Sequence, residues 1–102
     1  RKGYPWFGKH VSVELSSKNK KQLLVPRGFA HGFVVLSKEA IFSYKVDNYY
    51  NSDYDTGIAF DDKILQIDWK MKSSDIKLSN KDSKLPNVEK AKYFNYNSNL
   101  YV

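Results

Sequence analysis

Short runs in which apolar and polar residues alternate, each closed by a turn-forming segment, recur through residues 1–69. Residues 11–15 read Val, Ser, Val, Glu and Leu, and residues 40–46 alternate in the same way. A period of two puts one set of side chains on each face of an extended strand, so both runs predict half-buried strands. Residues 16–21 and 37–39 are polar and predict turns. The pattern as a whole predicts an all-β chain of about six short strands, arranged as a small barrel or sandwich.

The chain has 102 residues, of which 41% are hydrophobic and 16% aromatic, and this suits one domain with a modest core. We expect a single domain over residues 1–102, with barrel strands over residues 1–69 and a loop and tail over residues 70–102. Residues 70–84 are polar and predict a long loop. The tail is expected to be short helical or irregular, and residues 87–92 are the segment in which a short helix could form.

Composition also narrows the classes of partner. The chain has no cysteine, which removes disulfides and thiolate metal sites and makes the cytoplasm the expected compartment. No apolar run approaches the ~20 residues that cross a bilayer, so we expect no membrane partner. The net charge of +6 is found in many nucleic-acid-binding domains, but the lysines here are scattered as on a solvated surface. We therefore expect no nucleic-acid partner.

Residues 26–33 carry the clearest signal of a functional site. Pro26 fixes a turn, Gly28 and Gly32 permit tight backbone, and His31 lies between aromatic residues. A histidine in this setting is either a functional residue inside a barrel or a core residue that donates a hydrogen bond to a carbonyl. The residues alone leave both interpretations open.

Tyr44 is the second candidate. It shares a strand face with Phe42 and Val46, which predicts a phenol that points into the barrel. A tyrosine hydroxyl keeps its proton at neutral pH and can donate it as a general acid, although a plain core aromatic fits the same pattern. Only His10 and His31 could supply imidazole ligands, too few for a multi-histidine centre, so we expect no metal.

Many short segments of the chain recur in the order and spacing of a known family. They are Phe7-Gly8-Lys9, Val13-Glu14-Leu15-Ser16, Asn19-Lys20-Lys21-Gln22-Leu23, Pro26-Arg27-Gly28-Phe29-Ala30-His31-Gly32-Phe33, Leu36-Ser37, Phe42-Ser43-Tyr44-Lys45, Asn48-Tyr49-Tyr50, Gly57-Ile58, Asp62 and Ile67-Asp68-Trp69. In these segments the chain resembles the dTDP-4-dehydrorhamnose 3,5-epimerases. The similarity runs from residue 1 to about residue 86.

The resemblance implies a cupin-like (jelly-roll) β-barrel, incomplete at its N-terminal end, that pairs into a homodimer. It implies an isomerase that inverts C3 and C5 of dTDP-4-dehydro-6-deoxy-glucose in dTDP-L-rhamnose biosynthesis. In that reaction a base removes a proton next to the 4-keto group, an enolate forms, and an acid returns a proton from the opposite face. No metal or redox cofactor takes part.

The resemblance also implies a role for five residues. Tyr44 matches the tyrosine that acts as the acid, and Asp82 matches the aspartate that orients the histidine base. His31 matches a histidine that contacts the substrate, and Lys81 matches a substrate-binding lysine. Asp55 stands where the family often has a glutamate that contacts the nucleotide.

The base of the family lies in an Arg-Gly-Leu-His segment that this sequence does not contain, and neither His10 nor His31 matches it. The resemblance therefore implies the C-terminal part of an epimerase, with the acid side of the site but not the base side. We expect residues 1–102 alone to show no epimerase activity. The chain also departs from the family at Arg27, where a glutamate is common.

Two other functions stay open. The first is an epimerase with the same barrel that acts on another nucleotide-linked 4-keto sugar, for example a GDP-linked one, or that inverts C3 only. The second is a non-catalytic cupin-like module that binds a sugar nucleotide. Replacing Tyr44 with Phe separates the second from an enzyme, because a binding module would keep its ligand while an enzyme would lose turnover.

Overall fold

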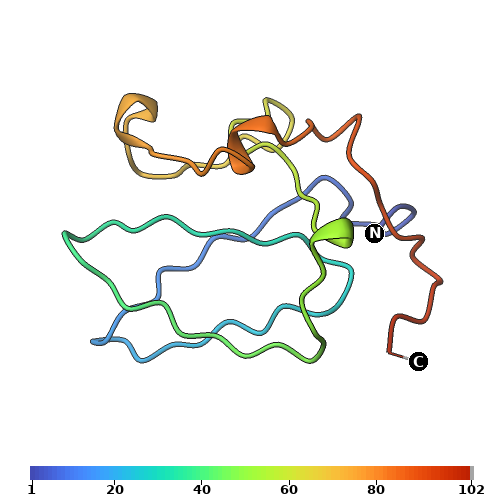
Figure 1. Cartoon of the computed structure of the whole chain (residues 1–102), viewed down its shortest axis with the longest axis horizontal. Coiled ribbons are helices and arrows are strands. Elements are labelled where there is room, and N and C mark those ends of the chain that lie inside the picture. The colour runs from blue at the N-terminus through green and yellow to red at the C-terminus, as the bar shows by residue number, and fades with distance from the viewer. Residues whose placement is uncertain (102) are drawn as a thin grey trace.

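A computed structural model describes residues 1–101 of the chain. Its regular elements are three short 3-10 helices, η1 (Ser52–Tyr54), η2 (Ser73–Asp75) and η3 (Asp82–Lys84). One parallel β-bridge joins Lys2 to Asn95. Turns and extended segments make up the rest of the described chain (Figure 1). The prediction of an all-β chain with a cupin-like (jelly-roll) β-barrel is therefore wrong, because residues 1–101 contain no sheet.

The predicted turns lie where the sequence placed them. The Lys20 N–H donates to the Ser16 carbonyl at 3.0 Å, and the chain bends at residues 37–38. The segments between these turns run as long extended tracks, coloured blue to green in Figure 1. No ladder of backbone hydrogen bonds joins them within residues 1–101. The sequence thus predicted the extended conformation and the turns correctly, but the extended segments do not pair into a sheet as predicted.

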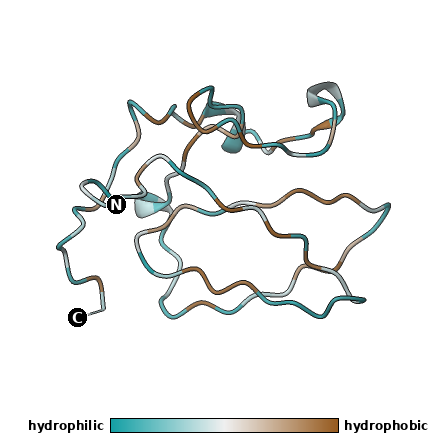
Figure 2. Ribbon diagram, turned by 180° about the vertical axis from the view of Figure 1, so that it is seen from behind, coloured by the Kyte–Doolittle hydropathy of each residue, from teal (hydrophilic) through white to brown (hydrophobic). Residues whose placement is uncertain are grey.

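The apolar side chains of these segments explain why no sheet forms. Ile41 is 98% exposed, Leu24 90% and Val11 84%. Figure 2 shows the hydrophobic stretches spread along the extended segments rather than gathered between two layers. Strands become stable when an apolar face packs against a further layer of structure. Nothing in the described chain provides that layer for residues 9–50.

The most compact part of the chain surrounds the carboxylate of Asp62. Asp62 is 7% exposed, and its Oδ1 accepts from the N–H groups of Ile64 at 2.8 Å and Leu65 at 3.0 Å. Its Oδ2 accepts from the N–H of Val88 at 2.8 Å. These three donors, Val88 foremost, hold the pKa of Asp62 below the usual 3.8 despite burial. The carboxylate therefore joins the turn at residues 63–65 to the segment that follows η3.

Further contacts close this region around Asp62. The indole N–H of Trp69 donates to the Phe60 carbonyl at 2.8 Å, and the Tyr93 hydroxyl donates to the Val88 carbonyl. Partial burial raises the pKa of the Tyr93 phenol. The Tyr93 ring also meets Phe7 edge-on, with ring centroids 4.8 Å apart. The C-terminal segment is thereby packed against the N-terminal turn.

The loop and tail differ in part from the prediction. Residues 70–84 form a loop as expected, but it contains η2 and η3. Residues 87–92 form a single turn in which the Ala91 N–H donates to the Asn87 carbonyl at 3.0 Å, so the tail is irregular here and not helical. No helix within the described residues is long and apolar enough to cross a membrane.

Candidate functional site

Asp55 and Lys81, predicted to bind substrate, form an ion pair in the structure. Asp55 follows η1, whose start is capped by the Asn51 side chain accepting from the Asp53 N–H at 2.9 Å. Lys81 immediately precedes η3, and its ammonium group donates to the Asp55 carboxylate. The Tyr50 hydroxyl donates to the same oxygen at 3.1 Å. Two one-turn helices thus bring together residues that lie 26 positions apart.

Each charge of this pair stabilises the other. The hydrogen bond from Lys81 lowers the pKa of Asp55 below 3.8, and the Tyr50 hydroxyl adds to the effect. The Asp55 carboxylate in turn raises the pKa of Lys81 above 10.5. Both residues are therefore charged throughout the neutral range. A partner that approaches this site meets a charge-balanced pair with a phenol beside it.

Asp82 lies next to this pair as the first residue of η3. Its backbone N–H donates to the Ser79 hydroxyl at 3.1 Å, and its carbonyl accepts from the Leu85 N–H at 3.4 Å. The side chain is exposed. Within the described residues its carboxylate makes no ion pair, so it is available to a group that arrives from elsewhere.

Tyr44 belongs to an aromatic row on one face of residues 33–44. The rings of Phe33 and Phe42 are stacked with centroids 4.0 Å apart, and the rings of Phe42 and Tyr44 follow at 5.0 Å. The shared face of Phe42 and Tyr44 agrees with their predicted parity. The predicted inward orientation is wrong, because Tyr44 is 70% exposed. Phe42 therefore supports one side of a phenol whose other side is open.

His31 follows the turn at residues 27–28. The Phe29 N–H donates to the Pro26 carbonyl at 3.3 Å, and Gly28 has φ +86°, a conformation that favours glycine. The imidazole is exposed and makes no hydrogen bond to the rest of the described chain. The structure therefore does not support the interpretation of His31 as a core residue that donates a hydrogen bond to a carbonyl.

The predicted residues form one cluster and two separate positions. Asp55, Lys81 and Asp82 lie together at η1 and η3, whereas no hydrogen bond or ion pair within residues 1–101 joins Tyr44 or His31 to them. Over the same residues, no group of three His, Cys, Asp or Glu side chains could hold a metal ion.

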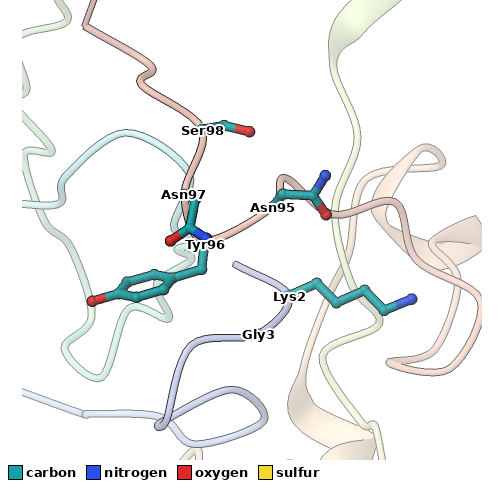
Figure 3. A pocket seen from close by; sticks show the side chains of 6 residues that line it. All are labelled: Lys2, Gly3, Asn95, Tyr96, Asn97 and Ser98. Atoms are coloured by element: carbon teal, nitrogen blue, oxygen red, sulfur yellow. The ribbon is translucent and has the colours of Figure 1, made fainter.

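The chain has an open hollow at the junction of its two ends. Its volume is about 460 Å³. Figure 3 shows the residues that line it, which are Lys2, Gly3, Asn95, Tyr96, Asn97 and Ser98. None of the five predicted site residues is among them. The hollow instead marks where the C-terminal tail lies against the N-terminus.

Sequence reasoning missed two residues that organise the site region. Tyr50 lies in the resembling Asn48-Tyr49-Tyr50 segment, but nothing in the sequence distinguished its hydroxyl from that of the adjacent tyrosine. Asp62 lies beside Asp61, and only the Val88 N–H, 26 residues away, shows which of the two carboxylates is enclosed.

Comparison with known proteins gives a consistent result. The family model described as dTDP-4-dehydrorhamnose 3,5-epimerase matches residues 1–90. The enzyme of that name from Shigella flexneri is 51% identical over 73 residues, which is 72% of this chain and 40% of the relative. The Escherichia coli (strain K12) protein of the same name is 54% identical over 67 residues, 66% of this chain and 36% of the relative. The Methanothermobacter thermautotrophicus protein of that name is 41% identical over 75 residues, which is 74% of this chain and 40% of the relative.

The matched region spans about two fifths of the length of these curated relatives. No solved structure matches the chain significantly. All five predicted site residues fall within residues 1–90, the part that the family model covers.

Proposed function

Because this chain belongs to the dTDP-4-dehydrorhamnose 3,5-epimerase family, we propose that it supplies the acid side of a nucleotide-sugar epimerase. The observation that carries the proposal is the family match over residues 1–90, the part of the chain that contains Tyr44, Asp82, His31, Asp55 and Lys81. The substrate proposed is dTDP-4-dehydro-6-deoxy-glucose, inverted at C3 and C5 in dTDP-L-rhamnose biosynthesis.

The proposed reaction uses the acidity of hydrogens next to a ketone. A base removes the proton at C3 or C5, and the electron pair moves onto the 4-keto oxygen as an enolate. Tyr44 then gives its hydroxyl proton to the carbon from the opposite face, and the configuration inverts. The exposure of Tyr44, 70% for the whole residue, supports this role, because the donor must reach the substrate carbon.

The remaining residues are proposed to hold the substrate and the base. The free carboxylate of Asp82 orients the histidine base, which we expect in the full-length protein outside residues 1–102. His31, exposed and without an internal hydrogen bond in the described chain, contacts the sugar. Asp55 and Lys81 contact the nucleotide as a charge-balanced pair. The family also suggests a homodimer in the cytoplasm, and sedimentation of the full-length protein tests the dimer.

Replacing Tyr44 with Phe in the full-length protein tests the proposal. The change removes the proton donor and keeps the ring on Phe42, so turnover is expected to fall by about 10²–10⁴-fold with substrate still bound. Epimerisation is measured by NMR of the sugar in heavy water. The control is Tyr54→Phe, because Tyr54 lies in η1, is 83% exposed and makes no side-chain hydrogen bond within residues 1–101.

Two results would count against this function. Unchanged turnover in Tyr44→Phe would remove Tyr44 from the reaction. Tight binding of the sugar nucleotide by the wild-type protein without any exchange at C3 or C5 would favour a non-catalytic binding module. Comparing dTDP- and GDP-linked keto sugars, and the number of carbons inverted, separates the proposed substrate from related ones.

A further inference from the structure

Arg27 reaches from the turn that carries His31 to two other parts of the chain. Its Nε lies 2.8 Å from Asp47 Oδ2, and its Nη1 donates to the Leu100 carbonyl at 2.5 Å. Its Nη2 lies 3.5 Å from the Asp47 carbonyl oxygen. A guanidinium group holds its donors in one rigid plane, so these contacts fix the direction of the side chain. Arg27 therefore joins three segments that are far apart in the sequence.

The C-terminal tail encloses Arg27 from the other side. The Tyr101 ring lies under the guanidinium, 5.1 Å from Cζ to the ring centroid, and the Tyr101 hydroxyl accepts from the Arg27 N–H at 3.1 Å. Arg1 Nη2 donates to the Arg27 carbonyl at 3.0 Å, and Arg1 Nη1 donates to the Ser98 carbonyl at 2.9 Å. Both the backbone and the side chain of Arg27 are held by residues from the two ends of the chain.

This arrangement, which we call the Arg27 clamp (Arg1, Arg27, Asp47, Leu100 and Tyr101), connects two predicted site positions. Asp47 directly follows residues 40–46, the segment that carries Tyr44, and Arg27 lies four positions before His31. An exposed ion pair alone is weak, and Asp47 is 62% exposed. Here the pair is one of several bonds to a single rigid group, so the connection does not depend on charge alone.

The clamp is a feature of this sequence rather than of the family match. Leu100 and Tyr101 lie beyond residues 1–90, where the family model ends. A carboxylate at position 27 would be repelled by Asp47 and could not donate to the Leu100 carbonyl. The arginine and the tail therefore depend on each other.

We propose that Arg27, held by the C-terminal tail, is a positioning residue that sets the His31 turn relative to the Tyr44 segment. This inference rests on the proposed function. Displacing His31 and Tyr44 from each other would leave the acid chemically intact but badly placed. The enolate would then be reprotonated more often from the face on which the base removed the proton, after that proton has exchanged with solvent, and the carbon would keep its configuration.

The test uses Arg27→Ala in the full-length protein, with Lys38→Ala as a control at an exposed turn. Arg27→Ala is expected to lower kcat/KM by about tenfold or more, within the roughly 100-fold that a 1 Å misplacement can cost. It is also expected to raise the ratio of deuterium exchange to inversion at C3 and C5. Arg27→Lys should recover only part of the lost kcat/KM. An ammonium group keeps the positive charge beside Asp47, but it lacks the planar set of donors that also reaches the Leu100 carbonyl.

The ratio of exchange to inversion separates positioning from stability. A variant that only unfolds more easily has fewer active molecules, and each of these keeps the wild-type ratio. Tyr101→Ala, a milder change at the surface, should move the ratio in the same direction as Arg27→Ala. An unchanged ratio in both variants would overturn the proposal.

A second measurement distinguishes failure of the clamp from failure of the proposed function. The ring resonances of His31 are expected to shift in Arg27→Ala and in Tyr101→Ala, but not in Lys38→Ala. If the wild-type protein does not epimerise, the proposed function is wrong. The clamp is overturned separately if the His31 resonances are the same in all four proteins.

Discussion

Replacing Gly28 with Ala is expected to destabilise the protein through two separable effects. Gly28 has φ +86°, a left-handed conformation that costs an L residue about 1–2 kcal/mol. The new Cβ would also lie 2.7 Å from Leu100 Cδ1 and 2.8 Å from Arg1 Nε, too close for non-bonded atoms. Both atoms lie near the ends of flexible side chains, so they can move aside. Arg1 would then give up hydrogen bonds worth about 1 kcal/mol net.

Gly8 offers a matched control for the backbone effect. It has φ +79°, close to that of Gly28, and a Cβ built there meets nothing within 4 Å. Gly8→Ala should therefore show the backbone cost alone, about 1–2 kcal/mol, while Gly28→Ala should lose about 2–3 kcal/mol. The difference, about 1 kcal/mol, reports the packing of the tail on this turn.

Thermal unfolding of the full-length protein measures both variants. For a domain of about 150–250 residues, 1 kcal/mol shifts Tm by about 2–4 °C, which gives a fall of about 4–12 °C for Gly28→Ala. Arg1→Ala should cost less in the Gly28→Ala background than in the wild type, because its contacts are already lost. Equal losses in Gly8→Ala and Gly28→Ala would refute the reasoning, since the tail would then not lie against Gly28.

Two further predictions follow from the carboxylates with lowered pKa. Lys81→Met removes the main hydrogen bond to Asp55 and should therefore raise the pKa of Asp55 toward 3.8, which a carbon-13 NMR titration measures. Lys84→Met should leave this titration curve unchanged. If the wild type and both variants gave the same curve, the Asp55–Lys81 ion pair would be excluded. Asp62 stabilises the fold above its unfolded pKa near 3.8, and this contribution is lost as the pH falls through its lower folded pKa. Asp62→Asn should therefore flatten the dependence of Tm on pH between about 2 and 6, whereas wild type and Asp61→Asn should keep it.

The sequence predicted the family and local conformation better than the assembly. The motif segments identified the epimerase family, and the match over residues 1–90 confirms it. Alternation correctly put Phe42 and Tyr44 on one face, where their rings lie 5.0 Å apart. The alternation of apolar and polar residues does not show which residues pack on that face, because this packing depends on residues distant in the sequence. The inward orientation of Tyr44 and the barrel were wrong for this reason.

The missing sheet has the same physical origin. Residues 9–50 have the alternation of half-buried strands, yet Ile41 and Leu24 remain almost fully exposed. No second layer of apolar side chains covers them within residues 1–101. A strand pattern is a local property, whereas a sheet also needs a second layer of apolar side chains.

The charges at η1 and η3 limit what this part of the site can bind. Lys81 contributes one positive charge, while Asp55 and Asp82 contribute two negative charges beside it. A nucleotide diphosphate needs cationic donors, and Lys81 already donates a hydrogen bond to Asp55. This cluster therefore suits hydroxyl, amide or imidazole groups, which accept and donate without a net charge. Under the proposed function, the groups that neutralise the diphosphate must come from outside the cluster, while Asp55, Lys81 and Asp82 serve the nucleoside and the histidine base.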